Sequence, residues 1–271
     1  MGNTKLEYET KRLDHLGIVA GICKQLDLIN MIDGLLPTPS ERKVSCGQAT
    51  QAMVLNALGL TGRALYLMPE YMKNKPIDLL IGEGLKAEDF NDDTLGRALD
   101  ELFQAGITEM FARITGKAVV IFEVAYESAH VDTSSFILQG NYESDIAREA
   151  VERRGAVKIT HGYSKEKRPD LKQIVVSLIA TQQSAIPLWL EALDGNSSDK
   201  KTFPVTVAAY CQQMKEGDKT LFVMDSASYS EENLTRWGEA KWLTRVPETS
   251  AEAKNAIKII ATTDMKKIGL R

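Results

Sequence analysis

Two aspartates in strand-like surroundings are the residues of this sequence best placed to do chemistry. Asp132 lies within His130–Leu138, where apolar and polar residues alternate as in a β-strand. An aspartate in mid-strand is disfavoured by propensity and costly if buried unpaired, so it needs a reason, and a bound cation would supply one. Asp225 ends the short apolar run Leu221–Met224, which is too short for a helix.

The position of Asp225 also suggests a ligand site. An acidic residue at the C-terminal end of a buried strand, before small polar residues and a helix, is where open α/β sheets place ligand groups. If the fold brings Asp132 and Asp225 together, their carboxylates form an oxygen-rich site that suits Mg²⁺ or Mn²⁺. The alternative is structural, with Asp225 capping the next helix and Asp132 pointing to solvent. These two residues alone favour neither interpretation.

Composition sets the class of protein. A chain of 271 residues can form one large or two medium domains, and 44% hydrophobic and 26% charged residues are ordinary for a soluble protein. Cys23, Cys46 and Cys211 are too widely spaced for a disulfide framework or a CxxC metal site, so we expect a reducing, intracellular setting. The polar start of the chain and the lack of a long apolar run argue against secretion or membrane anchoring.

Charge is unevenly distributed. The net charge is −4, which does not indicate a nucleic-acid-binding protein as a whole. Residues 1–125 hold 13 Lys and Arg against 17 Asp and Glu, whereas residues 126–271 hold 20 of each. Residues 145–173 have eight basic and five acidic residues, so they are the best phosphate-facing segment, although a solvated loop would look the same. The candidates for DNA contact there are His161, Lys165, Arg168 and Lys172.

Residues 1–125 are expected to form a helical domain. Apolar residues recur at three- and four-residue steps over 13–29, and Ser45 and Gln48 have the spacing of a capping box. Asn91 is a predicted N-cap of a helix that ends at Gly106, and residues 107–122 predict another. The expected buried face of the Asn91 helix is Leu95, Leu99 and Leu102. The result is a bundle of about four or five helices.

This bundle has two possible roles. One is a helix-turn-helix-like DNA-binding domain with five basic residues near phosphates. The other is a scaffold or dimerisation module with solvated basic residues, which we favour because no helix is basic enough for an obvious recognition helix. The five residues are Arg42, Lys43, Arg63, Lys73 and Lys75.

Residues 126–271 have the pattern of an α/β domain. After the Asp132 strand and a polar excursion at 141–155, strands are expected at 171–181 and 186–193, then a helix, a strand ending at Asp225, a helix and a last strand at 241–246. This is the order of an RNase H-like core, with a mixed sheet and flanking helices. In that fold the first and fourth strands are neighbours, which would bring Asp132 and Asp225 together.

Four ordered motifs also carry a family resemblance. They are His-Val-Asp-Thr-Ser-Ser (130–135), His-Gly-Tyr-Ser-Lys-Glu-Lys-Arg-Pro-Asp-Leu-Lys-Gln (161–173), Gly-Asn-Ser-Ser-Asp-Lys (195–200) and Met-Asp-Ser-Ala-Ser-Tyr-Ser (224–230). These motifs resemble those of bacterial insertion-sequence transposases with an Asp-Asp-Glu triad. Three stretches of the helical part, at 13–20, 51–59 and 80–84, resemble the N-terminal domain of the same proteins, so the likeness covers nearly the whole chain.

The resemblance implies DNA transposition by a two-metal mechanism with Mg²⁺ or Mn²⁺. Asp132 and Asp225 match the first two metal-binding, catalytic carboxylates. The implied partners are double-stranded DNA, as transposon ends and target, and further copies of the chain in a homo-oligomer on that DNA, with no membrane. The implied location is the bacterial cytoplasm, in association with the nucleoid.

The sequence departs from the family pattern at the third carboxylate. In the family this is a Glu in a Tyr/Arg/Lys-containing motif on a later helix, usually after an inserted segment. Glu248 and Glu252 lie on or before the last predicted helix, but neither sits in such a motif, and the chain stops at Arg271. We therefore expect a truncated RNase H-like domain. The alternative function is a catalytically inactive transposase fragment that acts only by binding DNA or another protein.

Overall fold

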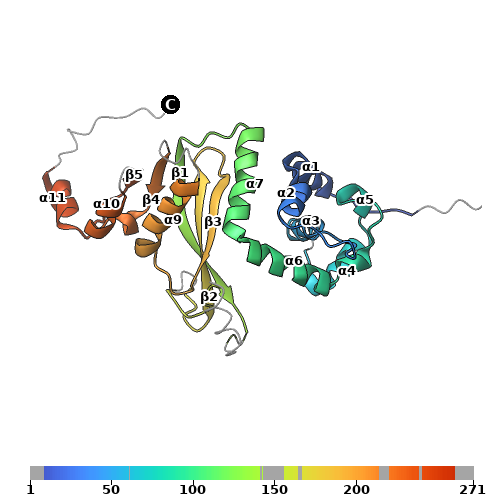
Figure 1. The fold of residues 1–271 in the computed structure, drawn as a ribbon. Coiled ribbons are helices and arrows are strands. Elements are labelled where there is room, and N and C mark those ends of the chain that lie inside the picture. The colour runs from blue at the N-terminus through green and yellow to red at the C-terminus, as the bar shows by residue number, and fades with distance from the viewer. Residues whose placement is uncertain are drawn as a thin grey trace, which may run out of the picture. The chain divides into compact units, whose positions relative to one another are not determined.

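The computed structural model describes residues 9–60, 62–140, 142, 156–163, 167–213, 220–237 and 240–259. The chain divides into two compact units, the first ending at Glu123 and the second starting at Val124. This division lies two residues before the 125/126 boundary expected from the sequence. The first unit is helical, and the second contains the sheet (Figure 1).

The first unit is built around helix α3, which contacts α1, α2 and α6. The short helices α4 and α5 were not predicted, because four or five residues are too few for an apolar period to show. The helices are α1 (Leu16–Leu26), α2 (Leu28–Leu35), α3 (Cys46–Ala57), α4 (Met68–Met72), α5 (Ile77–Leu80), α6 (Asp92–Ala105) and α7 (Ile107–Ile121), with 3₁₀ turns η1 (Leu65–Leu67) and η2 (Ala87–Phe90).

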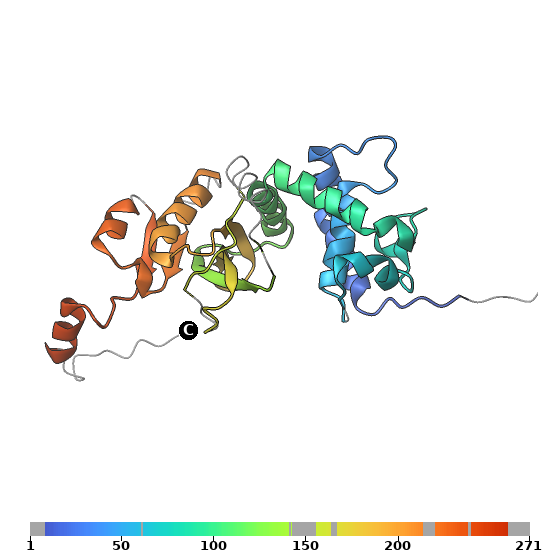
Figure 2. The same ribbon diagram turned by 90° about the horizontal axis from the view of Figure 1, so that it is seen from below.

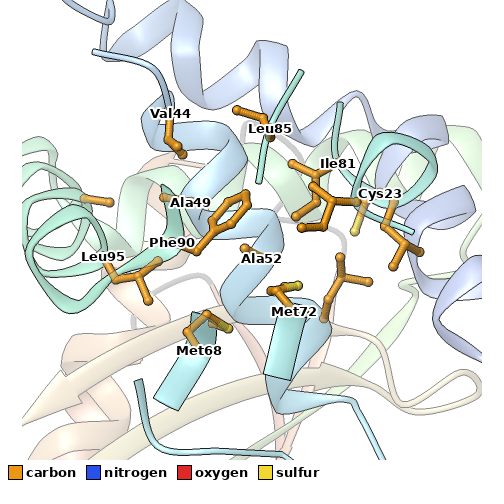
Figure 3. Close-up of a cluster of buried hydrophobic side chains, with 14 of the residues drawn as sticks. Cys23, Val44, Ala49, Ala52, Met68, Met72, Ile81, Leu85, Phe90 and Leu95 are labelled. Carbon is orange, nitrogen blue, oxygen red and sulfur yellow. The ribbon is translucent and has the colours of Figure 1, made fainter. Parts of the chain in front are cut away.

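Small residues on α3 make room for large neighbours in the core of this unit. Ala49 and Ala52 are buried, and the ring of Phe90 from η2 lies against them (Figure 3). Met68 and Met72 of α4 lie below Phe90 and Ala52 in the same view, and both are fully buried. Unbranched methionine side chains fill irregular space between helices well, which suits the short α4.

The start of α3 follows the sequence prediction. The Ser45 hydroxyl accepts a hydrogen bond from the Gln48 amide at 3.1 Å, and the Gln48 side-chain oxygen accepts one from the Ser45 amide at 3.0 Å, which confirms the capping box. Between them, the Gly47 amide donates to Asp33 at 2.7 Å. A Cβ on Gly47 would lie 2.5 Å from the Ile29 carbonyl oxygen, so glycine allows α2 and α3 to touch.

Two details of the first unit differ from expectation. The apolar stripe over 13–29 is divided between α1 and α2, because Asp27 takes a left-handed conformation (φ 56°) that ends α1. Asn91 caps α6 as predicted, accepting from the Thr94 amide at 2.9 Å. Leu95 is fully buried, but the prediction for Leu99 was wrong, since its side chain is 43% exposed.

The second unit contains a five-stranded mixed sheet in the order β3-β2-β1-β4-β5. β1 pairs antiparallel with β2 and parallel with β4, β2 pairs antiparallel with β3, and β4 pairs parallel with β5. With its flanking helices this confirms the predicted RNase H-like α+β architecture. The elements are β1 (Ser128–Leu138), β2 (Lys172–Thr181), β3 (Pro187–Leu193), α9 (Asp199–Gln213), β4 (Leu221–Met224), η4 (Ser226–Ser228), α10 (Glu231–Arg236), β5 (Lys241–Thr244) and α11 (Ala251–Ile259).

Helix α9 covers one face of this sheet, where it contacts β1 and β2 (Figure 1). Tyr210 of α9 lies edge-on to Trp189 of β3 and Phe222 of β4, with ring centroids 6.1 Å and 5.8 Å away. The buried Thr206 hydroxyl lies 3.2 Å from both the Ser177 hydroxyl and a Glu191 carboxylate oxygen. These contacts anchor α9 by aromatic packing and by a small polar network.

Helix α11 differs from α9 in its surroundings. None of its nine residues, all of which the structure describes, is buried. In both views it lies beyond β5 and α10, at the edge of the second unit (Figures 1 and 2).

Candidate functional site

The register between β1 and β4 relates the two aspartates. Ser128 pairs with Leu221, and the pairing continues in parallel to His130 with Val223, each residue paired with the one 93 positions later. Continued by two residues, the same register puts Asp225 opposite Asp132. Asp225 follows the last residue of β4 and keeps an extended backbone (φ −75°, ψ 176°). Because neighbouring strands lie about 4.8 Å apart, side chains at these positions can reach one ion.

Both aspartates lie on the sheet face opposite α9. Val131 and Thr133, on either side of Asp132, are buried beneath α9, whereas Asp132 is exposed. Met224 is likewise buried, and Asp225 after it is exposed. The predicted alternation of β1 is therefore confirmed, and the same alternation directs Asp225 to the face of Asp132.

Hydrogen bonds hold both residues in place. The Thr133 amide donates to the Asp132 carboxylate at 2.7 Å, and the Thr133 hydroxyl bonds to Asp199 at the start of α9. The Ala227 amide donates to the Asp225 carboxylate at 2.9 Å, so Asp225 caps η4. The Thr244 hydroxyl at the end of β5 donates to the Asp225 carbonyl. Asp225 therefore acts as a cap, as in the structural interpretation. Its carboxylate still has a second oxygen that could bind a cation, as in the ligand-site interpretation.

Two further polar residues lie on this exposed face of β1. His130 and Ser134 flank Asp132 at two-residue spacing, and both are exposed. Both belong to the His-Val-Asp-Thr-Ser-Ser motif, but neither was predicted to have a role of its own. Strand alternation was the signal that could have found them, since residues i−2 and i+2 share the face of residue i.

The donor set fits a divalent cation in part. Two carboxylates from adjacent strands are hard oxygen ligands of the kind that Mg²⁺ uses, with water and substrate phosphate in the remaining positions. Among the described residues, no group of three His, Cys, Asp or Glu side chains could hold a metal ion. Glu248 and Glu252 are both exposed, the first before α11 and the second in its first turn, and they form no such group with the aspartates.

The predicted DNA contacts fall in different environments. His161 is exposed, and Lys172 is half-buried at the first residue of β2. Arg168 makes a bidentate pair with Asp170, at 2.9 Å and 2.7 Å. This pairing raises the pKa of Arg168 and lowers the pKa of Asp170, and it offsets much of the charge that Arg168 could offer to a phosphate. Lys165 lies outside the described residues, as does most of the 141–155 excursion.

The segment around His161 is held against the loop after β3. Thr160 and Gln173 exchange two backbone hydrogen bonds. The buried side-chain amide of Gln173 donates a further hydrogen bond to the Gly195 carbonyl at 2.7 Å. The Gly195 amide in turn donates to the Lys158 carbonyl at 2.9 Å. Two of the four motifs, one with Gly162 and one with Gly195, therefore meet at Gln173. We call residues 158–163, Gln173 and 194–195 the Gln173 junction.

In the first unit, three of the basic residues considered for DNA contact are in ion pairs. Arg42 pairs with Glu101, Lys43 with Asp89 at 2.6 Å, and Lys75 with Asp14 at 3.1 Å. The hydrogen bond from Lys75 lowers the pKa of Asp14. Cations held by carboxylates have less charge to offer to DNA phosphates.

Comparison with known proteins adds the following. Residues 8–116, within the first unit, match the model of a family described as a domain of unknown function (DUF4277). No curated protein matches the sequence. Among solved structures, the chain is similar to one described as "Mos1 transposase paired-end complex with left transposon end", at 8% identity over 89% of this chain, with a TM-score of 0.28. This chain covers 61% of that one, and a likeness of this degree carries no weight for fold or activity.

In the part of the chain that the structure describes, no helix has both the length and the apolar character needed to span a membrane.

Proposed function

We propose that the second unit is the catalytic domain of an insertion-sequence DNA transposase, with Asp132 and Asp225 as two of its metal-binding carboxylates. The observation that supports this proposal is the parallel β1–β4 register, which pairs His130 with Val223 and, if continued by two residues, would bring Asp132 opposite Asp225 on the exposed face of the sheet. Paired carboxylates on neighbouring strands of an RNase H-like sheet suit phosphodiester chemistry.

The residues of the chain have distinct tasks in this proposal. Asp132 is held by β1, which pairs with β2 at Asp132 itself and with β4 up to His130. Asp225 is fixed through its own carbonyl, which Thr244 holds, and through the capping bond to Ala227. A divalent cation bound there would supply Lewis-acid stabilisation of charge on the scissile phosphate and activation of the attacking water or 3′-hydroxyl. The chain's contribution is a preorganised pair of oxygen ligands.

A second candidate function is binding without cleavage. The observation that favours it is that, among the described residues, no third acidic side chain joins the pair. In this case the chain occupies transposon-end DNA or associates with a complete copy of the transposase. Both candidates involve double-stranded DNA, so DNA affinity alone does not separate them.

The separating experiment measures nicking of supercoiled DNA by the purified chain with Mg²⁺, with Mn²⁺ and with chelator. Under the catalytic proposal we expect metal-dependent nicking that Asp132→Asn and Asp225→Asn each abolish. Asp100→Asn, at an exposed position of α6 in the first unit, is the control and should nick like the wild type. DNA binding with no nicking under any metal would leave only the binding function.

Metal binding itself gives a readout that does not depend on activity. Titration of Mn²⁺ followed by electron paramagnetic resonance should show a site that either asparagine variant weakens, since each removes one charged ligand. Glu248→Gln and Glu252→Gln should leave this Mn²⁺ site unchanged if neither glutamate is a ligand. Unchanged Mn²⁺ binding in Asp132→Asn would refute the assignment of the site.

A further inference from the structure

A row of polar side chains lies between α9 and the sheet. Thr133 of β1 pairs with Ser177 of β2, and Ser177 pairs with Glu191 of β3, so the three residues lie side by side on the face that α9 covers. Thr133 is 3% exposed, and Ser177 is fully buried. Buried hydroxyls are costly unless they are hydrogen-bonded, and α9 supplies partners at two points, Asp199 and Thr206.

One of these two points is connected to the candidate site. The Thr133 hydroxyl donates to Asp199, the first residue of α9, and the Thr133 backbone amide donates to the Asp132 carboxylate at 2.7 Å. In the described part of the sheet, β1 pairs with β4 only as far as His130, so at Asp132 the strand is paired with β2 alone. The bond to Asp199 therefore adds a second restraint on the residue whose amide orients the Asp132 carboxylate.

This contact also joins two of the four motifs. Thr133 belongs to the motif at 130–135, and Asp199 belongs to the motif at 195–200. We propose that Thr133 and Asp199 are positioning residues for the candidate metal site. Asp199 holds Thr133, and Thr133 holds the Asp132 carboxylate in the orientation that binds the cation. Asp199 does not itself ligate the cation, because it lies on the α9 side of the sheet and Asp132 lies on the other.

The inference rests on the proposed function and extends the candidate site through the sheet to α9. Groups that hydrogen-bond to metal ligands fix their orientation, and loss of such a group typically lowers metal affinity 10- to 100-fold. A role of this kind predicts that metal binding at Asp132 depends on a hydroxyl and a carboxylate that the metal does not touch.

The test is the Mn²⁺ titration followed by electron paramagnetic resonance, with the full chain. Thr133→Val removes the hydroxyl and keeps a β-branched side chain suited to the strand, and it should weaken Mn²⁺ binding about tenfold. Thr133→Ser keeps the hydroxyl and should bind Mn²⁺ like the wild type. Asp199 is half-buried, so Asp199→Ala removes the same bond with less disturbance of the core, and it should weaken binding to the same degree.

A double variant tests whether the two residues act through one bond. Thr133→Val combined with Asp199→Ala should bind Mn²⁺ no more weakly than either single variant, because the second substitution has nothing left to remove. Fully additive losses would show that the two side chains act separately and would overturn the inference.

Thr206→Val is the matched control, because it makes the same substitution in the same polar row. The Thr206 hydroxyl lies 3.2 Å from Ser177 and from Glu191, on the two strands next to β1 in the order of the sheet. Each of the two valine variants loses buried hydrogen bonding, so each should lower the urea midpoint followed by tryptophan fluorescence by about 0.5 M. Only Thr133→Val should also weaken Mn²⁺ binding.

The outcomes separate the inference from the proposed function. Wild-type Mn²⁺ affinity in Thr133→Val and Asp199→Ala, with the expected loss in Asp132→Asn, would overturn the positioning role and leave the proposed function standing. Equal weakening by Thr206→Val and Thr133→Val would also overturn it, because the loss would then come from disturbed packing of α9. Failure to find any Mn²⁺ site that depends on Asp132 would overturn the proposed function and the inference together.

Discussion

The Gln173 junction makes a sharp prediction about Gly195. A Cβ at this position would lie 1.9 Å from the Gln173 carbonyl oxygen and 2.6 Å from that of Thr160. Both neighbours are backbone atoms, which cannot rotate away as the end of a flexible side chain can. Gly195→Ala must therefore push the loop after β3 outward by about 1 Å, because Cβ contacts with oxygen need at least about 3 Å.

The cost follows from the hydrogen bonds that cross this contact. An outward shift breaks three hydrogen bonds. They run from the Gln173 side-chain amide to the Gly195 carbonyl, from the Gly195 backbone amide to the Lys158 carbonyl, and from the Lys158 backbone amide to the Asp194 carboxylate. At a net value of about 1 kcal/mol each, the loss is about 3 kcal/mol. With a urea m-value of about 2 kcal/mol/M, the unfolding midpoint should fall by about 1.5 M.

Tryptophan fluorescence is the assay, because all three tryptophans, at 189, 237 and 242, lie in the second unit. The signal therefore reports unfolding of this unit even if the helical unit unfolds separately. Asn196→Ala, at the exposed neighbouring position, is the control and should move the midpoint by less than about 0.3 M. If Gly195→Ala moved the midpoint no more than Asn196→Ala does, the contact would not hold this part of the fold.

Three further predictions concern stability. Ser45→Ala should lower the free energy of unfolding of the helical unit by about 1 kcal/mol through loss of the capping box, measured by circular dichroism, whereas Ser45→Asp should retain most of it. Gly116→Ala should stabilise the chain by about 0.5–1 kcal/mol in the same assay, because Gly116 is inside α7 and an added Cβ would meet nothing within 4 Å. Burial, followed by the nearby Cys211, raises the pKa of Tyr210 from 10.0 to about 12. Its stabilising effect is complete below pH 10 and is lost as the pH rises to 12, by up to about 3 kcal/mol in fluorescence-monitored urea melts, and Tyr210→Phe should show a smaller loss over that range.

Local signals predicted much of the fold. The alternation in β1, the capping box at Ser45 and the N-cap at Asn91 each depend on residues close together in the chain, and the structure contains all three. The errors came from contacts made at a distance or from single backbone conformations. Nothing in the sequence pattern marks Asp27 as left-handed, and periodicity cannot tell that Leu99 lies outside the core.

The candidate site was predicted only in part, because it too depends on contacts between residues far apart in the chain. Strand order suggested that Asp132 and Asp225 would be neighbours, but their relative level follows only from continuing the observed β1–β4 register by two residues. The bidentate pairing of Arg168 with Asp170 and the anchoring of Tyr163 by Gln173 depend on side-chain geometry that charge counts do not contain. The structure thus lowers the charge that Arg168 could offer to a phosphate.

The four transposase-like motifs consequently differ in what they do. Those around Asp132 and Asp225 bear the carboxylates, whereas those with Gly162 and Gly195 meet in the Gln173 junction. If the proposed function is correct, substitutions in both pairs of motifs should abolish DNA nicking. Those at the aspartates remove metal ligands, whereas those at Gly162 or Gly195 disturb the fold of the Gln173 junction. Asp132→Asn should leave the fluorescence-monitored melt nearly unchanged, because the residue is exposed, and Gly195→Ala should shift it. Measuring nicking together with the melt therefore separates residues that do the chemistry from residues that hold the site.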